Sequence, residues 1–188
     1  MPEVHIRDHL SVVESLLDIS PLIEKIADML LSGMKHGGRM FLCGNGGSAA
    51  DAQHIAAELV GRFAHQRRGL PAIALTTDTS ALTSIGNDFG FDHVFSRQVE
   101  ALAREGDILI GLSTSGNSRN VIEAVKVARE MGVTTVGLLG GTGGALKDLV
   151  DHALVVPSPD TPRIQECHIL VGHIWCAMID EAFREDRP

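Results

Sequence analysis

Four hydroxyl side chains gather in one short stretch of the chain, Ser113-Thr-Ser-Gly-Asn-Ser118. The stretch follows an apolar run and precedes a helical pattern, as expected for a loop between a strand and a helix. One Ser or Thr is enough to cap a helix, whereas several neutral donors beside free helix N–H groups can surround a phosphate. No Gly-Lys-Ser/Thr follows, so the loop is not a P-loop. We predict a phosphate-binding loop, with helix capping as the alternative.

A glycine-rich loop, Gly44-Asn-Gly-Gly-Ser-Ala-Ala50, opens an earlier helix. Its spacing formally fits the dinucleotide fingerprint, but the next strand ends in Thr76-Thr77 rather than in an acidic residue. Contact with a small anion or sugar, through backbone N–H groups and the Ser48 hydroxyl, is therefore favoured over a nicotinamide or flavin cofactor. A turn that merely needs glycine is the other alternative. The later run Gly140–Gly144 contains one polar side chain, Thr142, and is predicted to be a turn.

Ionisable and amide side chains gather on two predicted helices. His54 and Glu58 are spaced i,i+4 and share one helix face, a spacing that resembles a metal pair. Gln165 and His173 lie within about 80° of one stripe of a later helix. A chance surface hydrogen bond and a buried core histidine are the alternatives. Competitors for the same role are Glu166, Cys167 and His168.

Five continuous apolar runs alternate with helical stretches, a pattern typical of strands buried on both faces of a parallel sheet. The expected strands are 39–43, 71–75, 107–112, 134–139 and 152–156. The expected helices are 48–63, 79–86, 92–104, 118–131, a weaker one at 142–150, and 160–183. This alternation predicts an α/β fold, a doubly wound three-layer sandwich of about five parallel strands, with ligands at the carboxyl ends of the strands.

Residues 4–36 carry apolar positions at helical spacing and predict two N-terminal helices outside the sheet. Ser20 is the expected N-cap of the second helix, with Pro21 at its first position. That helix is expected to end near Gly37-Gly38. No linker or low-complexity run divides the chain, so one domain over 1–188 is expected.

Composition excludes several classes of function. Sixteen Lys and Arg against 24 Asp and Glu give a net charge of -8, which argues against binding nucleic acid through a general basic surface. The three cysteines form no CxxC and favour a reducing compartment. No apolar stretch is long enough to span a bilayer, and the N-terminus lacks an apolar signal core. We expect a cytoplasmic protein with no membrane partner.

Together, these motifs resemble the sugar isomerase (SIS) fold, which is flavodoxin-like, here with extra N-terminal helices. More narrowly, they are similar to the phosphoheptose isomerases over nearly the whole chain and in the same order. The motifs are Gly44-Asn-Gly-Gly-Ser48, Asp51-Ala-Gln-His54-x-x-x-Glu58, Ile85-Gly-Asn-Asp88, Ser113-Thr-Ser-Gly-Asn-Ser118 and Arg163-Ile-Gln165…His173. The Asn87-Asp88 pair has no convincing capping role of its own.

The resemblance implies conversion of D-sedoheptulose 7-phosphate to D-glycero-D-manno-heptose 7-phosphate through an enediol, for the nucleotide-activated heptose of cell-envelope glycans such as lipopolysaccharide. It places the catalytic pair on Glu58 and His173. It places one zinc ion per subunit on His54, Glu58, Gln165 and His173. It places substrate contacts on Asn45, Gly46, Gly47, Ser48, Glu58, Asn87, Asp88, Ser113, Thr114, Ser115, Ser118 and Gln165. Whether zinc acts in catalysis or in positioning, and which catalytic group is the first base, stay open.

The family also implies a homotetramer with active sites between subunits. We expect the helices of residues 1–37 and the long apolar C-terminal helix to build the interfaces and to bring Glu58 and His173 together from different subunits. A non-enzymatic SIS-family binding protein, of the type that associates with a replication initiator, is the main alternative. Those relatives lack the Glu and the His that are present here as Glu58 and His173. An isomerase for another phosphosugar is a further alternative. A sugar-phosphate-sensing regulator would need a DNA-binding module, for which 188 residues leave little room.

Overall fold

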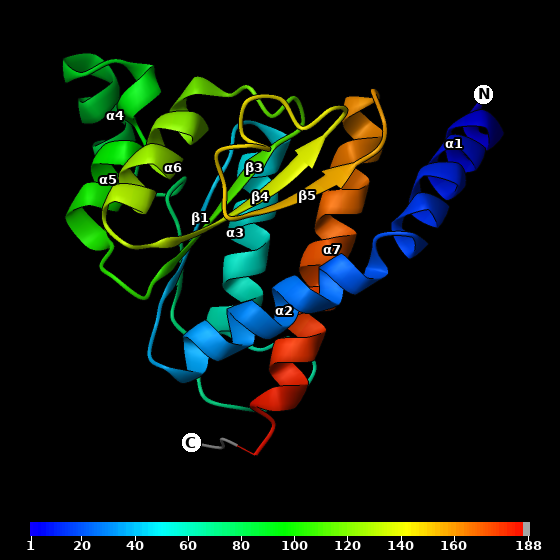
Figure 1. Ribbon diagram of the computed structural model, residues 1–188, viewed down its shortest axis with the longest axis horizontal. Helices are drawn as coiled ribbons and strands as arrows, with labels where there is room; N and C mark the ends of the chain where they lie inside the picture. Colours follow the sequence, from blue (N-terminus) through cyan, green and yellow to red (C-terminus); the bar gives the residue numbers. More distant parts are fainter. Residues whose placement is uncertain (186–188) are drawn as a thin grey trace.

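The computed structural model describes residues 1–185 and contains one five-stranded sheet (Figure 1). The strands run in the order β2-β1-β3-β4-β5, and every neighbouring pair is parallel. Their bounds are β1 Met40–Cys43, β2 Ala72–Ala74, β3 Ile108–Ser113, β4 Thr134–Gly140 and β5 His152–Val156. The predicted α/β fold with five parallel strands is therefore confirmed.

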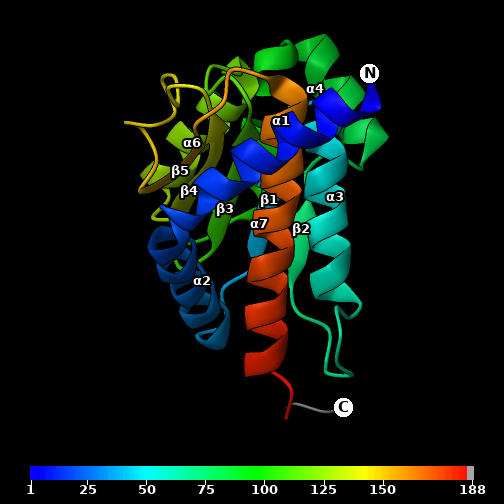
Figure 2. The same cartoon turned by 90° about the vertical axis from the view of Figure 1, so that its right-hand side faces the viewer.

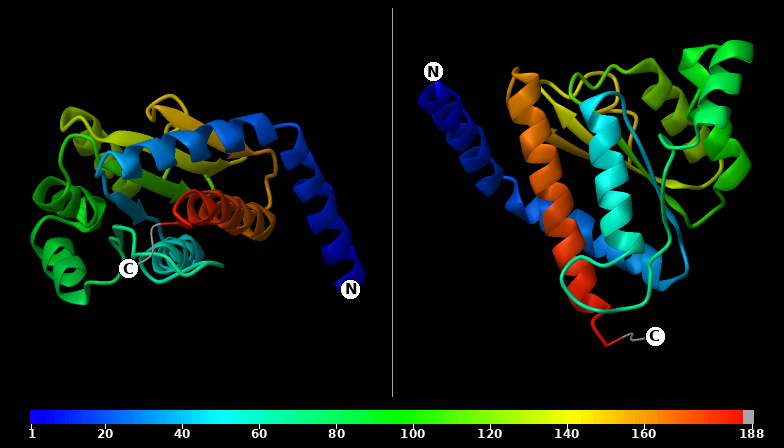
Figure 3. Two further views of the ribbon diagram at one scale, coloured as in Figure 1. Left: turned by 90° about the horizontal axis from the view of Figure 1, so that it is seen from below. Right: turned by 180° about the vertical axis from the view of Figure 1, so that it is seen from behind.

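Helices cover both faces of the sheet, because successive side chains of a strand point to opposite faces. Met40 and Leu42 of β1 pack in one core with α2, α3 and α7, whereas Phe41 and Cys43 pack in a second core with α5 and α6. The bounds are α2 Ser20–Lys35, α3 Gly47–Val60, α4 Thr79–Asp88, α5 Ser96–Leu102, α6 Arg119–Glu130 and α7 Thr161–Ala182. The predicted three-layer sandwich is confirmed, with α3 and α7 side by side on one face (Figures 2 and 3).

The first helix, α1 Pro2–Glu14, projects away from the sheet (Figure 1). It contains no buried residue, and a short 3₁₀ turn, η1 Ser15–Leu17, joins it to α2. Two N-terminal helices outside the sheet were predicted, and this part is confirmed. None of the helices in residues 1–185 is long and apolar enough to cross a membrane.

The expected helix at 142–150 is wrong, since this segment forms turns. Three of its glycines, Gly141, Gly143 and Gly144, have positive φ angles, which an α-helix cannot accommodate. The turn predicted at Gly140–Gly144 is confirmed. It packs closely on the loop of residues 113–118, here called the hydroxyl loop: a Cβ at Gly116 would lie only 1.9 Å from the Gly143 carbonyl oxygen.

Three other boundaries differ from the expectations. Residues 92–104 divide into a 3₁₀ turn, η2 Phe91–His93, and α5. The expected helix 48–63 ends at Val60, and an irregular loop over 61–71 leads to β2. Ser20 is not an N-cap: Ile19 occupies that position, and the Ser20 hydroxyl donates to the Leu17 carbonyl 2.8 Å away.

Candidate active site

The strand order reverses direction between β1 and β3, which places the loops that follow these strands at a topological switch point. Asn45 follows β1, and Asn120 lies in the first turn of α6 after β3. Their amides are paired twice, with each Nδ2 donating to the other's Oδ1 at 2.9 and 2.8 Å. The pair ties the loop of residues 44–47, here called the glycine loop, to the first turn of α6. The sequence analysis did not identify Asn120, because only the strand order brings it close to Asn45.

The hydroxyl loop lies at the carboxyl end of β3, as predicted. Ser113 is buried and its hydroxyl is 2.9 Å from that of Ser118. Ser118 is the N-cap residue of α6 but makes no side-chain capping bond. The Ser115 hydroxyl accepts from the Asn117 N–H, and Thr114 is half-buried. Capping therefore does not account for these hydroxyls, and the start of α6 lacks a side-chain cap from Ser118.

The glycine loop meets α7 through Gln165. A Cβ at Gly47 would lie 2.7 Å from Gln165 Nε2, so the absence of a side chain at Gly47 makes room for this amide. Gly46 has a φ of 56°, which favours glycine. Ser48 is buried, and its side chain lies against the backbone of Gly44. A cavity of about 190 Å³ opens beside the loop, lined in part by Asn45, Gly46, Thr76 and Phe91.

The structure brings His54, Glu58 and His173 of one chain together, with one ligand atom from each lying within 4.8 Å of the others. The expectation that Glu58 and His173 meet from different subunits is therefore wrong, because α3 and α7 of the same chain pack side by side. His54 Nε2 is 3.3 Å from Glu58 Oε1 and 3.4 Å from His173 Nε2. The two imidazole rings meet edge to face with centroids 4.9 Å apart. His54 is exposed and the other two are half-buried, so the cluster is open to solvent.

The approach of α3 to α7 makes this cluster possible. Gly172 lies where the helices touch, and a Cβ there would be 2.6 Å from Ile55 Cδ1. On the next residue of α7, His173 reaches the stripe of α3 that carries His54 and Glu58. The Phe63 ring from the 61–71 loop lies 5.8 Å from the His173 ring.

The donor set fits a zinc ion. Tetrahedral zinc with ligands at ~2.0–2.1 Å separates neighbouring donor atoms by roughly 3.3 Å. The Nε2–Oε1 and Nε2–Nε2 separations of 3.3 and 3.4 Å match that value. Two imidazole nitrogens and one carboxylate oxygen are also a common zinc ligand set. Gln165 lies two turns of α7 before His173, against Gly47.

Asp51 is a residue of the site to which the sequence analysis gave no role. It lies one turn before His54 on α3, and its Oδ2 is buried without a hydrogen-bond partner in residues 1–185. Burial raises the pKa of Asp51, although His54 and His173 act in the opposite direction. The i,i+3 spacing of Asp51 and His54 was the signal that could have identified it.

The alternative candidates on α7, Glu166, Cys167 and His168, have other roles in the structure. His168 is buried, and its Nε2–H donates to the Leu139 carbonyl at 3.0 Å. Burial lowers the pKa of His168 to about 4, which fits a neutral core histidine. Glu166 is 2.7 Å from both His9 and Arg163, and Cys167 is buried.

Asn87 and Asp88 are not part of this cluster. Both are exposed at the end of α4, and the Asn87 amide donates to Asp88 Oδ1 at 2.7 Å. Within residues 1–185, neither forms a hydrogen bond with another predicted site residue. One chain therefore brings together most of the predicted site without these two residues.

Comparison with known proteins identifies the family of this chain. The SIS domain family matches residues 6–140 of this chain. Phosphoheptose isomerase from Geobacter metallireducens is 59% identical over 177 residues, which cover 94% of each chain. The chain belongs to the phosphoheptose isomerase family.

Solved structures of this family have the same fold. Phosphoheptose isomerase from Neisseria gonorrhoeae superposes with a TM-score of 0.90 and 48% identity, over 95% of this chain and 96% of that one. A phosphoheptose isomerase from Francisella tularensis gives a TM-score of 0.89 and 37% identity, over 96% and 99%. The SIS fold predicted from the motifs is confirmed.

Family membership also bears on the main alternative. A non-enzymatic SIS-family binding protein is expected to lack the Glu and the His of the catalytic pair. This member of the phosphoheptose isomerase family has both Glu58 and His173, each within reach of His54. The site is therefore equipped with the ionisable groups that proton transfer requires.

Proposed function

We propose that this chain is an aldose–ketose isomerase that converts D-sedoheptulose 7-phosphate to D-glycero-D-manno-heptose 7-phosphate. The observation that carries the proposal is the meeting of His54, Glu58 and His173 within 4.8 Å, in a chain 59% identical to a phosphoheptose isomerase. The same family supports a single SIS domain over residues 1–188, a cytoplasmic location, and a product used for the activated heptose of lipopolysaccharide and other cell-envelope glycans.

The reaction needs groups that move protons and no oxidant. A base removes the proton from C1 of the ketose, the C1–C2 enediol forms, and the proton is returned at C2. In parallel, a second group moves a proton from the C1 hydroxyl to the C2 oxygen. Glu58 is the candidate base at carbon, and His173 is the candidate shuttle between the oxygens. The two side chains come from facing helices, an arrangement that suits groups acting on one substrate.

The phosphate end of the substrate is assigned to the hydroxyl loop. Ser113, Thr114, Ser115 and Ser118 supply neutral donors at the carboxyl end of β3, and the N-terminus of α6 adds backbone N–H groups and a favourable dipole. The glycine loop is assigned to the sugar hydroxyls through Asn45 and the backbone of Gly46 and Gly47. Holding the phosphate here fixes the reacting carbons relative to the ionisable cluster.

One zinc ion per subunit is assigned to His54, Glu58, Gln165 and His173. Support comes from the separations of 3.3 and 3.4 Å among the first, second and fourth of these. A bound zinc ion would supply Lewis-acid polarisation of the carbonyl oxygen or would act in positioning alone, because a cation lowers the proton affinity of a carboxylate such as Glu58. Metal analysis of purified protein, with His173→Gln as the control, tests the assignment: the wild type should hold about one zinc per chain and the variant less.

A homotetramer with active sites between subunits is part of the same proposal. Helix α1 has no fully buried residue within its own chain and exposes Val4, Ile6 and Leu10. The cavity of about 190 Å³ beside Asn45 is smaller than the ~300–1,000 Å³ of typical ligand pockets. A neighbouring chain could complete it, and Asn87 and Asp88 could act across that interface. A fully active monomer in light scattering at micromolar concentration would contradict this part.

The decisive experiment incubates purified protein with D-sedoheptulose 7-phosphate and identifies the product by NMR, with and without a chelator. Formation of D-glycero-D-manno-heptose 7-phosphate is the expected result. Ketose phosphates of five and six carbons, supplied in parallel, test the alternative of another phosphosugar. Turnover of one of these but not of the heptulose would replace the proposed substrate, and binding without any turnover would favour the non-enzymatic alternative.

A further inference from the structure

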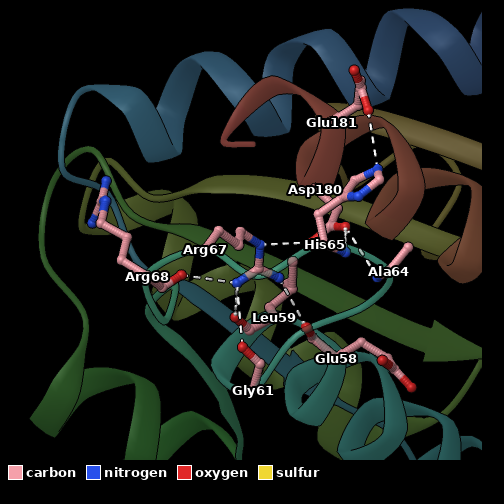
Figure 4. A network of polar contacts seen from close by, with 9 residues as sticks. All are labelled: Glu58, Leu59, Gly61, Ala64, His65, Arg67, Arg68, Asp180 and Glu181. Atoms are coloured by element: carbon pink, nitrogen blue, oxygen red, sulfur yellow. Dashed lines mark hydrogen bonds and ion pairs between the residues drawn. The ribbon is translucent and has the colours of Figure 1, made fainter. Parts of the chain in front are cut away.

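A buried ion pair lies close to the ionisable cluster without belonging to it (Figure 4). Arg67, from the 61–71 loop, places its Nε 2.8 Å from Oδ1 of Asp180 on α7. The exposed fractions of the two side chains are 0% and 1%. Neither of these two atoms has a hydrogen-bond partner elsewhere in residues 1–185. Each of the two charged side chains therefore has the other as its oppositely charged partner.

The Arg67 guanidinium also ends helix α3. Its Nη2 donates to the Glu58 carbonyl at 3.0 Å, and its Nη1 donates to the carbonyls of Leu59 and Arg68, each at 2.9 Å. The last carbonyls of a helix have no partner within the helix, and a cation beside them is favourable. The Glu58 carboxylate points away from the guanidinium (Figure 4). Arg67 thus holds the backbone of Glu58 and leaves its side chain free.

Asp180 holds the other side of the same junction. Its Oδ2 accepts the backbone N–H groups of Ala64 and His65 at 3.0 and 2.7 Å. This fixes the loop that presents Phe63 to the His173 ring. Asp180 lies seven residues after His173, about two turns along α7 and on nearly the same face. The pair therefore joins the helix of Glu58, the helix of His173 and the loop that packs on His173.

Stability alone is a weak reason for such a pair. Taking two charges out of water costs several kcal/mol, and apolar replacements of buried pairs are often neutral or stabilising. What a buried pair with many directed hydrogen bonds adds is a fixed geometry. Burial would raise the pKa of Asp180, but the N–H groups of His65 and Ala64 and the Arg67 charge outweigh it and lower that pKa. Asp180 is thus an anion at neutral pH.

We propose that Arg67 and Asp180 are positioning residues that hold Glu58 and His173 at the separation which proton transfer and zinc binding require. The inference rests on the proposed function, since it concerns the same two groups. Both side chains are fully buried, so the proposal gives neither of them a contact with the substrate. Their effect passes through the end of α3 and through the packing of α3 on α7.

The chain offers a matched control among the residues that precede β1 and β3. Asp107, before β3, has no exposed side-chain surface, pairs with Arg39 at 2.7 Å, and accepts the backbone N–H groups of Arg39 and Arg104. It has the same partners by type as Asp180: one arginine and two amides. It lies at the amino ends of β1 and β3, away from the cluster.

The experiment compares Asp180→Asn and Arg67→Lys with Asp107→Asn. Thermal unfolding first identifies a temperature at which all three proteins are fully folded. There, Asp180→Asn and Arg67→Lys should lower kcat roughly 10- to 100-fold, the usual effect of removing a group that orients metal or catalytic residues. KM for the phosphosugar should change little, because the hydroxyl loop is untouched. Zinc affinity, measured by titration of the apoprotein, should fall in parallel.

Asp107→Asn should lower the unfolding temperature by a similar amount and leave kcat and zinc affinity unchanged. Equal losses of kcat in all three proteins, or wild-type kcat and zinc affinity in Arg67→Lys, would overturn the inference. If Asp180→Asn does not fold, Arg67→Lys, which keeps the charge, decides alone. Glu58→Gln distinguishes a failure of the proposed function from a failure of the positioning role. An active Glu58→Gln rejects the proposed function. An inactive Glu58→Gln beside wild-type Arg67→Lys rejects only the positioning role.

Discussion

The two ends of the candidate site are built in different ways. The loop end, residues 45–48 and 113–118, offers neutral donors that are already held by hydrogen bonds, such as Ser113–Ser118 within one loop and Asn45–Asn120 between the loop after β1 and the start of α6. The helix end consists of three ionisable groups, His54 and Glu58 on α3 and His173 more than 100 residues later on α7, which meet only because α3 packs on α7. Holding the substrate and moving its protons are thus assigned to separate parts of the fold, so variants should separate KM from kcat.

The largest effect is expected for Glu58→Gln, which keeps the shape of the side chain but cannot take up a proton. General acid–base groups contribute ~10²–10⁴-fold, so kcat should fall by about that factor. Folding and phosphosugar binding should survive, as measured by thermal unfolding and by calorimetric titration. His173→Gln should behave alike and lose zinc as well. Substantial turnover by Glu58→Gln would remove it from the role of base.

A smaller effect is expected at the loop end for Thr114→Val, which removes one donor from the phosphate site. A hydrogen bond to a charged group is worth ~1.5–3 kcal/mol, so kcat/KM should fall roughly 10- to 150-fold, mainly through KM. Thr142→Val, in the neighbouring glycine turn, is the control and should leave the kinetics unchanged. Steady-state kinetics of both variants decide whether the hydroxyl loop belongs to the site.

Gly47→Ala tests the place where the two ends touch. A methyl group there would lie 2.7 Å from Gln165 Nε2, so the amide must move. We expect KM and kcat to change together, with zinc affinity lower by roughly 10-fold. On a Gln165→Ala background the same substitution should cost little more, because the clashing partner is gone. Additive effects of the two substitutions would show that Gly47 does not act through Gln165.

The smallest effect on activity is expected for His168, which lies on α7 between Gln165 and His173 but bonds to Leu139 of the sheet. Its folded pKa of about 4 is below the ~6.5 of an unfolded histidine. Between these values only the unfolded chain takes up the proton. Its contribution to stability is therefore complete above pH 6.5, declines by about 3 kcal/mol as the pH falls to 4, and is constant below.

Denaturant unfolding between pH 4 and 7 measures this slope. His168→Gln can still donate to the Leu139 carbonyl but does not titrate, so its stability should depend less on pH than that of the wild type. Its kcat at pH 7 should match the wild-type value. An unchanged pH slope would contradict the neutral state of buried His168. A large loss of kcat would make His168 a site candidate again.

Local patterns predicted those parts of the fold that depend on neighbours in the chain. The apolar runs identified all five strands, and the loops after β1 and β3 were placed correctly because a strand end and a helix start can be recognised locally. The helix expected at 142–150 was wrong because it was predicted from local apolar spacing. That spacing does not show that glycines of this turn adopt positive φ angles.

Contacts between distant segments were beyond the sequence. Arg67 and Asp180 are separated by more than 100 residues and show no spacing that would pair them. Asn120 has a role only because β1 and β3 are neighbours. Asp51 was visible as a carboxylate one turn from His54, but its burial follows from tertiary packing. The resemblance to a family supplied what the spacing could not, namely which of the ionisable residues belong together.

The strand order also sets the time at which the site can be assembled as the chain emerges from the ribosome. Strand β1 pairs on one side with β2 and on the other with β3, so the two substrate loops become neighbours only after about residue 120 has been synthesised. His173 follows on the last helix. Contacts of such large sequence separation form late and slowly. A chain that has not been synthesised past residue 173 therefore lacks the proposed proton shuttle, so such unfinished chains are expected to carry no isomerase activity.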